Sequence, residues 1–361
     1  MPSDFPADSS ANAPAPANAG PPQPIVIQQR ESLFGRLGKF LVFALVVCIA
    51  IIAGLSAKYQ SYFNEPTGPQ EKYHSLSKTA TDKVAILSVT GAIMETDNFA
   101  KKQIDRIRKD ESVKAIVLRV NSPGGTVTYS DYLLHHLNKL AEERELPVVV
   151  SMGSVCASGG YYVAMAVGDQ PDTIFAEPTT WTGSIGVIIP HYDFSGAMQN
   201  MLFKIRDDSI ASGKFKQMGS PTRRMTDEEV ALFQEMVDLS YEGFLEKVRA
   251  GRPALAETPD KLAEITQGQI FTAGQAVENG LVDKIGFVED AVDRALELAG
   301  LTAESARCVR YAKPVGPLDS LLSARPAQPE PPAATLRSLI DFSTPRAYYL
   351  WSTLPSLLDR Q

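Results

Sequence analysis

The sequence predicts an α/β protein with a mostly parallel sheet and helices outside it, preceded by a membrane-spanning helix. Three observations predict this fold class. Val- and Ile-rich runs alternate with helical segments at intervals of about 30 residues, as in βαβ units. The runs are nearly continuous in apolar residues, which is typical of strands buried on both faces. Glycine-bearing turns follow several of the runs. We therefore expect one large α/β domain.

The periodicity assigns the elements of this domain in order. Apolar runs that resume after polar or glycine-rich breaks predict strands over 83–93, 114–125, 146–153, 172–178 and 183–193. Apolar residues at helical spacing predict helices over 98–113, 128–145, 156–167 and 225–250, with shorter ones within 257–300. Thr226 is expected to cap the long helix at 225–250 in a capping box with Glu229.

The N-terminal part has a different composition. Residues 1–35 begin with a segment rich in Pro, Ala, Ser and Asn, and are predicted to be a disordered cytoplasmic tail. Residues 36–58 are predicted to be a transmembrane anchor, because the uncharged stretch 40–57 would cover roughly 27 Å as a helix. A cleaved signal peptide is the alternative. Residues 59–80 are polar and are predicted to be a linker.

Positive charge is uneven around the apolar segment. Arg30, Arg36 and Lys39 precede it, whereas Lys58 follows it. Because cytoplasmic flanks carry the excess of Lys and Arg, the N-terminus is expected in the cytoplasm. The domain after residue 58 is then expected on the extracytoplasmic side.

Composition excludes several function classes. The 361 residues carry a net charge of −7 and no basic stripe, so nucleic acid is not expected as a partner. The three cysteines have no metal-ligand spacing, and no phosphate-binding or dinucleotide motif is present, so no metal and no cofactor are expected. A bridge between Cys156 and Cys308 is the one disulfide that we considered, and we do not expect it.

Three glycine-bearing turns point to acyl transfer. They are NSPGG at 121–125, ASGG at 157–160 and TGSIG at 182–186. Turns at the ends of parallel strands collect functional groups. The serine of the second turn would project from the start of a helix, and glycine amides of the first two turns would supply oxyanion donors. Taken singly, each glycine could also be simple strand–helix punctuation.

The serine needs a base, and the residues leave two kinds open. His191 is the conventional candidate, with Asp193 or Asp172 to orient it. Lys214 and Lys216 are the others. A lysine has an ordinary pKa near 10.4 and acts as a base near neutral pH only where apolar surroundings lower that value. With a lysine base, activity should be higher on the alkaline side.

With these residues in view, the chain resembles the signal peptide peptidase A family, peptidase family S49. The resemblance spans roughly residues 83–300, in order. The motifs that carry it are NSPGG, GSVCASGGYYVA, TWTGSIGV, SGKFKQMGSPTRRMTDEE, SYEGFLEKVRAGR and GQIFTAGQAVENGLVDKIG. The single copy with an N-terminal anchor is similar to the short, one-domain members. The resemblance implies a peptidase domain over 81–305 with a crotonase/Clp-like ββα spiral.

The family also implies a Ser/Lys dyad. Carried over to this sequence, Ser158 is the nucleophile and Lys216 the general base, with Lys214 ranked second. Oxyanion donors would be the amides of Gly159 and of the NSPGG loop. In that loop the donor would be the amide of Gly125, with Gly124 beside it. Ser184 would form a hydrogen bond with the lysine through its hydroxyl. If the family's dyad holds, His191 is not the base and is expected only to line the site.

Partners and location follow from the same resemblance. The expected activity is that of a serine endopeptidase of the bacterial inner membrane, which degrades cleaved signal peptides and other apolar peptides. A homo-oligomer is expected, with the dyad formed within or between subunits. The Pro-rich extension 306–361 has an apolar, aromatic end that would bind the membrane, a neighbouring subunit or the protein's own groove. The alternatives are an inactive scaffold of a membrane-quality complex and a crotonase-type acyl-thioester enzyme.

Overall fold

A computed structural model describes residues 33–63, 68–200, 206–313 and 348–350. The predicted disordered tail lies outside these residues, except for its last three. The chain divides into two compact units, Met1–Pro66 and Thr67–Gln361, which are described separately.

The first unit contains one long helix, α1 (Leu33–Phe63). Its segment Leu37–Ser56 has a hydropathy of 2.6 over 20 residues and is long and apolar enough to cross a membrane. The segment's large apolar side chains are exposed within the protein, so it is not a core helix. The helix therefore suits the predicted anchor by length and composition.

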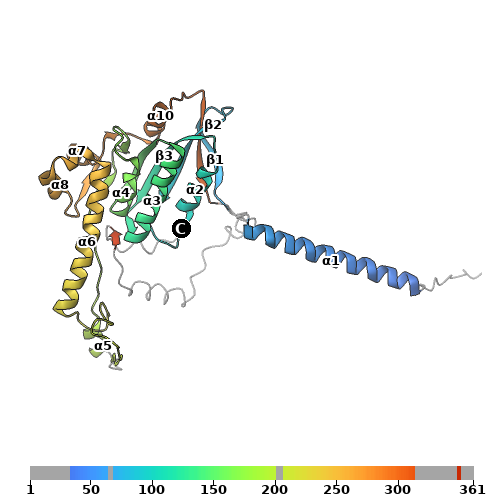
Figure 1. Ribbon diagram of the computed structural model, residues 1–361, viewed down its shortest axis with the longest axis horizontal. Helices are drawn as coiled ribbons and strands as arrows, with labels where there is room; N and C mark the ends of the chain where they lie inside the picture. Colours follow the sequence, from blue (N-terminus) through green and yellow to red (C-terminus); the bar gives the residue numbers. More distant parts are fainter. Residues whose placement is uncertain (1–32, 64–67, 201–205, 314–347, 351–361) are drawn as a thin grey trace, which may run out of the picture. The chain divides into compact units, whose positions relative to one another are not determined.

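The second unit is built on one mixed sheet in the order β1-β10-β2-β3-β5-β6-β9, with β7 paired to both β5 and β8. Figure 1 labels β1, β2 and β3 of this sheet. The pairs from β10 to β9 along this order, and the pair β5–β7, are parallel. The strands are β1 (Gln70–Leu76), β2 (Asp82–Thr90), β3 (Val113–Ser122), β5 (Val148–Ala157), β6 (Ile174–Ala176), β7 (Trp181–Gly183), β8 (Ile270–Thr272), β9 (Lys284–Ile285) and β10 (Ala306–Ala312). The predicted α/β class is confirmed.

Helices cover both faces of this sheet. Alternate residues of β2 divide between two cores: Leu87 packs with residues of α2 and α3, whereas Ile86 packs with residues of α10. This division explains why the strands are apolar at nearly every position. The helices are α2 (Phe99–Arg108), α3 (Val127–Arg144), α4 (Gly159–Ala164), α5 (Ser195–Asn200), α6 (Asp227–Gly251), α7 (Pro253–Ala256), α8 (Pro259–Ile265), α9 (Ala273–Asn279) and α10 (Val288–Leu298), with a 3-10 turn at Met165–Val167.

A second, two-stranded sheet lies beside the first. It pairs β4 (Gly124–Thr126), directly after β3, with β11 (Tyr348–Leu350) from the C-terminal extension. The two strands are antiparallel, although some 220 residues of sequence separate them. The end of the chain that the structure describes is therefore part of the folded body.

Several predicted boundaries were wrong. The predicted linker 59–80 holds the end of α1 and strand β1, which pairs with β10 at the sheet edge. Strand β10 begins where the predicted domain ends, so the sheet includes the first residues of the predicted extension. The strand predicted over 183–193 does not form. Strand β7 covers Trp181–Gly183 and ends there, because positive φ angles of 89° and 51° at Gly183 and Ser184 turn the chain away from the sheet.

Other predictions on the same elements are confirmed. Thr226 caps α6 in a capping box with Glu229. The cysteines Cys156 and Cys308 are buried and free in strands that are not neighbours, so no bridge joins them. Burial raises the pKa of the Cys156 thiol, which keeps it a neutral core residue.

Candidate active site

The three predicted glycine-bearing turns meet at one edge of the sheet. Strand β3 ends at Ser122, β5 at Ala157 and β7 at Gly183. Strand β5 pairs in parallel with both neighbours, with Ser122 opposite Cys156 and Gly183 opposite Ala157. The carboxyl ends of three adjacent strands therefore lie side by side, as the sequence predicted.

Ser158 occupies a strained turn between β5 and α4. Its φ and ψ are 54° and −116°, outside the ordinary regions for a residue other than glycine. The Ser158 amide donates to the Gly183 carbonyl at 2.8 Å, and its carbonyl accepts from the Tyr162 amide at 2.9 Å. Such a backbone costs about 1–3 kcal/mol and is retained where the surroundings impose it. The two hydrogen bonds hold the serine between a strand end and a helix start.

The Ser158 hydroxyl makes no hydrogen bond that would stabilise its turn, among the residues that the structure describes. The residue is 1% exposed, and its hydroxyl does not cap α4. No hydrogen bond of this hydroxyl is found within the part of the chain that the structure describes. The strained backbone of this nearly buried serine is a costly arrangement, and such strain is found at reactive groups.

Gly159 brings the helix start against the NSPGG loop. A Cβ built on Gly159 would lie 2.6 Å from Ser130 Oγ and 3.1 Å from the Gly125 amide nitrogen. The Gly124 amide donates to Ser122 Oγ at 3.0 Å, so Gly124 is already engaged. The Gly125 amide nitrogen lies against Gly159, and the Gly124 Cα lies 3.2 Å from the same Cβ position. Both glycines of the loop therefore approach the start of α4.

Ser130 is a contact that the sequence did not indicate. It lies in the first turns of α3, is fully buried, and donates to the Thr126 carbonyl at 2.9 Å. Its hydroxyl fills the space against Gly159. A serine among the polar positions of an amphipathic helix gives no signal of such packing, so only the tertiary contact reveals it.

Gly159→Ala is expected to reduce peptide hydrolysis by about 10²-fold, because the added methyl must displace Ser130 or the Gly125 amide from the site. Gly274→Ala is the control, since a Cβ at that helical position meets nothing within 4 Å. Steady-state kcat/KM and thermal unfolding of both variants check this. An active Gly159→Ala protein would show that the close approach has no role in turnover.

Ser184 is adjacent to Ser158 through the sheet. It is 7% exposed, has a φ of 51°, and its amide donates to the Gln269 carbonyl at 2.6 Å. The preceding residue, Gly183, accepts the hydrogen bond from the Ser158 amide. The structure therefore brings Ser184 to the same edge as Ser158, Gly159 and the NSPGG loop.

Lys216 is exposed to solvent, whereas a lysine that acts as a general base near neutral pH needs apolar surroundings. The side chain is exposed, on a loop of turns after residue 206. Within the described residues, no hydrogen bond joins its amine to the Ser158 hydroxyl. Lys214 is also exposed and forms an ion pair with Glu228. Among the residues that the structure describes, Lys216 is thus exposed to solvent and lacks the apolar surroundings that a lysine base needs.

The loop that carries Lys216 is tied to α6. The Arg223 guanidinium donates to the Gln217 carbonyl at 2.9 Å and to Glu229 at 2.5 and 2.8 Å. This hydrogen bonding to Arg223, with that from the Thr226 backbone, lowers the pKa of the Glu229 carboxyl to about 2. Arg223 and Glu229 therefore position the loop relative to the helix start.

Glu229→Gln is expected to lower both the melting temperature and kcat, because the charge that holds Arg223 on the loop is lost. Since the pKa is lowered from 4.5 to about 2, the carboxylate stabilises the fold fully above pH 4.5. The melting difference from wild type should then shrink as pH falls below 4.5. Thermal melts between pH 7 and 3 check this, and a difference independent of pH would contradict it.

The conventional triad is not assembled. His191 is half-buried, but Asp193 caps the Ser195 amide at 2.9 Å and pairs with Arg224 at 3.4 Å. The other predicted orienter, Asp172, pairs with Lys284 at 3.4 Å. Neither carboxylate orients the imidazole within the described residues.

Strand β11 covers the free edge of the NSPGG loop. Tyr349 lies opposite Gly125, with Tyr348 opposite Thr126 and Leu350 opposite Gly124. Strand β11 also lies near α3 and α4. A segment of the C-terminal extension thus lies directly on the loop that was predicted to hold the oxyanion donors.

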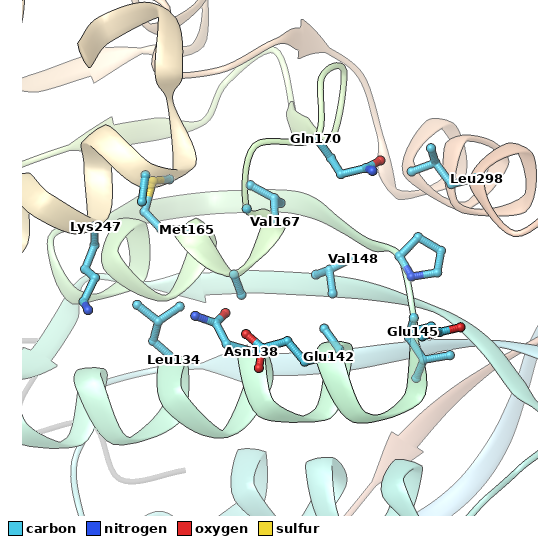
Figure 2. Close-up of a pocket in the computed structure, with 16 residues that line it drawn as sticks. Leu134, Asn138, Glu142, Glu145, Val148, Met165, Val167, Gln170, Lys247 and Leu298 are labelled. Atoms are coloured by element: carbon cyan, nitrogen blue, oxygen red, sulfur yellow. The ribbon is translucent and has the colours of Figure 1, made fainter.

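Two cavities differ in their relation to this site. One of about 540 Å³ is lined by α3, α6 and the turn Met165–Val167, at the end of α4 away from Ser158 (Figure 2). It includes none of the predicted site residues. Another of about 420 Å³ is lined by Ser184, Gly186, Tyr241 and Thr266, and therefore borders the site.

The fold and the site together define a class of protein. An α/β body that holds a buried serine on a strained strand-to-helix turn, with amides of two glycine turns beside it, is the arrangement of a serine hydrolase. Comparison with known proteins gives the family. The model of peptidase family S49 matches residues 141–302, which include Ser158, Ser184 and Lys216. The chain belongs to peptidase family S49.

The relatives support the same family. A putative signal peptide peptidase SppA of Enterococcus faecium is 35% identical over 223 residues, which cover 58% of this chain and 62% of that protein. A putative protease of Synechocystis is 38% identical over 227 residues, covering 62% of this chain and 77% of that protein. Protease 4 of Salmonella typhi is 35% identical over 60% of this chain, but the match spans 35% of that protein.

Proposed function

We propose that the protein is a membrane-anchored serine endopeptidase with Ser158 as nucleophile. One observation carries the proposal: Ser158 is held buried on a strained turn, beside the amides of Gly159 and Gly125. The family supports the class of reaction, and relatives named proteases support it further. The anchor is α1, whose segment Leu37–Ser56 has the required length.

The reaction follows the ordinary steps of acyl transfer. The Lys216 amine takes the proton of the Ser158 hydroxyl while Oγ attacks the peptide carbonyl. The amides of Gly159 and Gly125 donate to the oxyanion. The proton then passes from Lys216 to the departing amine as the peptide bond breaks, and water hydrolyses the acyl-serine with the same lysine as base. Ser184 accepts a hydrogen bond from the lysine ammonium in this scheme.

The apolar cover that Lys216 needs would come from assembly of several copies of the chain. Because Lys216 is exposed on its loop, we propose that packing between copies of the chain covers it and brings it to a Ser158. The adjoining helix α6 has a surface suited to such packing, since Met236 and Leu239, three residues apart on one face, are 47% and 69% exposed. The homo-oligomer and the Ser/Lys dyad are therefore parts of one proposal.

The substrates we propose are apolar peptides, cleaved signal peptides among them. The cavity beside Ser184 gives a side chain room next to the nucleophile. The E. faecium relative bears the name of a signal peptide peptidase. We place the domain on the extracytoplasmic side of a bacterial inner membrane, with the N-terminus in the cytoplasm, and assign the sheet to a crotonase/Clp-like ββα spiral.

Hydrolysis by the purified full-length protein in detergent tests the proposal. A fluorogenic apolar peptide should be cut at an internal amide, with the rate unchanged by a chelator. Fatty acyl-CoA thioesters, the substrates of the alternative crotonase-type enzyme, should not be hydrolysed. Thioester cleavage without peptide cleavage would overturn the proposal, and so would the absence of both, which is the behaviour of a scaffold.

A further inference from the structure

Strand β5 contains a bulge, residues 153–155, shortly before Ser158. Along the neighbouring strand β3, Val120 lies opposite Met152 and Ser122 lies opposite Cys156. Two steps along β3, from 120 to 122, thus correspond to four steps along β5, from 152 to 156. In a regular ladder, Cys156 would lie two residues further along β3 than it does. The extra residues of the bulge therefore bring the turn with Ser158, instead of the strand itself, to the NSPGG loop.

The turn from β6 to β7 binds this bulge. Strand β5 pairs with β6 as far as Met152 and with β7 from Val155 onward, so the turn passes the bulge where β5 changes partner. Thr180, the last residue of the turn, is fully buried, and its Oγ1 donates to the Gly153 carbonyl at 2.7 Å. The Thr180 amide donates to the Glu177 carbonyl at 2.9 Å, which closes the turn. A side chain of the turn thus holds the first carbonyl of the bulge.

Two side chains of β3 bind backbone groups at the two ends of the bulge. The Arg119 guanidinium donates to the Met152 carbonyl at 3.2 Å. The Asn121 Oδ1 accepts from the Val155 amide at 3.2 Å. Because Thr180 is fully buried whereas Asn121 is exposed, water can replace the hydrogen bond of Asn121 but not that of Thr180. Thr180 is therefore the contact on which the shape of the bulge depends most.

We propose that Thr180 is a positioning residue for the nucleophile: it holds the bulge of β5 through the Gly153 carbonyl, and the bulge sets where Ser158 stands relative to the glycine amides. This inference rests on the proposed role of Ser158 and adds a residue that acts on it through the strand. Without the Thr180 hydroxyl, the buried Gly153 carbonyl loses its donor and the bulge relaxes. A shift of the reacting atoms by about 1 Å is enough to lower turnover by about 10²-fold.

Thr180→Val in the full-length protein tests the inference, because valine has the shape of threonine without the hydroxyl. We expect kcat on an apolar peptide to fall by about 10- to 10²-fold, and labelling of Ser158 by a fluorophosphonate to slow in proportion. KM should stay near the wild-type value, because Thr180 does not line the cavity beside Ser184. Thr180→Ser keeps the hydroxyl and should retain most of kcat. If Thr180→Ser is as slow as Thr180→Val, the hydroxyl does not position the nucleophile and the inference is wrong.

Thr173→Val is the matched control. Thr173 is also fully buried, and its Oγ1 donates to the Gln170 carbonyl at 2.7 Å, the same kind of hydrogen bond at the start of β6. Both variants should lower the melting temperature, since each leaves a carbonyl without its donor. Only Thr180→Val should lower kcat and slow the labelling of Ser158. Equal losses of kcat in the two variants would give Thr180 a merely structural role and overturn the inference.

Gly153→Ala tests the bulge without touching Thr180, and it decides the question if Thr180→Val does not fold. The new Cβ would lie 3.0 Å from Asn121 Cβ and 3.2 Å from Asn121 Oδ1, so it crowds the bulge from the side of β3. We expect kcat to fall with KM nearly unchanged, and a wild-type kcat in Gly153→Ala would overturn the inference.

Failure of the inference and failure of the proposed function give different results. If the wild-type protein neither hydrolyses peptide nor is labelled at Ser158, the proposed function itself is wrong. If the wild type is active and labelled at Ser158, and Thr180→Val is labelled at the same rate, the peptidase proposal stands and only the role of Thr180 is wrong.

Discussion

Ser158→Ala is expected to lower kcat/KM for peptide hydrolysis by about 10⁴-fold or more, which leaves only the small residual rate that binding and the oxyanion donors give. Without the hydroxyl no acyl-enzyme forms, and no neighbouring serine lies on the same strained turn. The fold should remain intact, because the hydroxyl caps no helix. Initial rates on an apolar peptide, together with thermal melts, check both parts of the expectation.

A second serine, on the strand that leads to Ser158, separates the effect on chemistry from the effect on stability. Ser151 is buried in β5, and its Oγ accepts a hydrogen bond from Arg119 at 2.8 Å. Ser151→Ala should lower the melting temperature and keep kcat/KM within a small factor, the reverse of Ser158→Ala. If Ser158→Ala keeps kcat/KM near the wild-type value, Ser158 is not the nucleophile.

Lys216→Ala is expected to lower kcat by about 10²–10⁴-fold, the usual contribution of a general base. Lys214→Ala is the matched control, because that lysine is two residues away and is already paired with Glu228. We expect the control to stay near the wild-type rate. If Lys214→Ala is inactive and Lys216→Ala is active, the base has been assigned to the wrong lysine.

Mixing inactive variants shows how the base reaches the serine. If a neighbouring copy supplies Lys216, subunits of Ser158→Ala and Lys216→Ala that are exchanged into one assembly should regain part of the wild-type activity, because some interfaces then hold an intact pair. If the dyad forms within one chain, the mixture stays inactive. The exposure of Lys216 favours recovery.

Local sequence patterns predicted the turns of the site well. The Val/Ile runs before NSPGG, ASGG and TGSIG indicated strands, and the three turns do meet where adjacent parallel strands end. This succeeded because the period of the apolar residues and the position of glycine are local properties. The strand predicted after Gly183 failed for a local reason that the apolar run concealed, namely two successive residues with positive φ.

The sequence did not allow us to predict which distant segments of the chain pair as strands. Strand β1 is polar at several positions because it is an edge strand, so its composition resembled that of a linker. The pairing of β11 with β4 depends on backbone groups of Gly125, which every residue carries and no pattern marks. The exposed position of Lys216 depends on how its loop packs in three dimensions, which no short motif of the sequence marks.

The most direct test of the central claim is the site of covalent labelling by a fluorophosphonate in the full-length protein, mapped by mass spectrometry of its peptides. We predict one adduct, on the hydroxyl of Ser158, formed in step with the loss of peptide hydrolysis. An adduct on another residue with the same loss of activity, or full activity after complete labelling of Ser158, would contradict it.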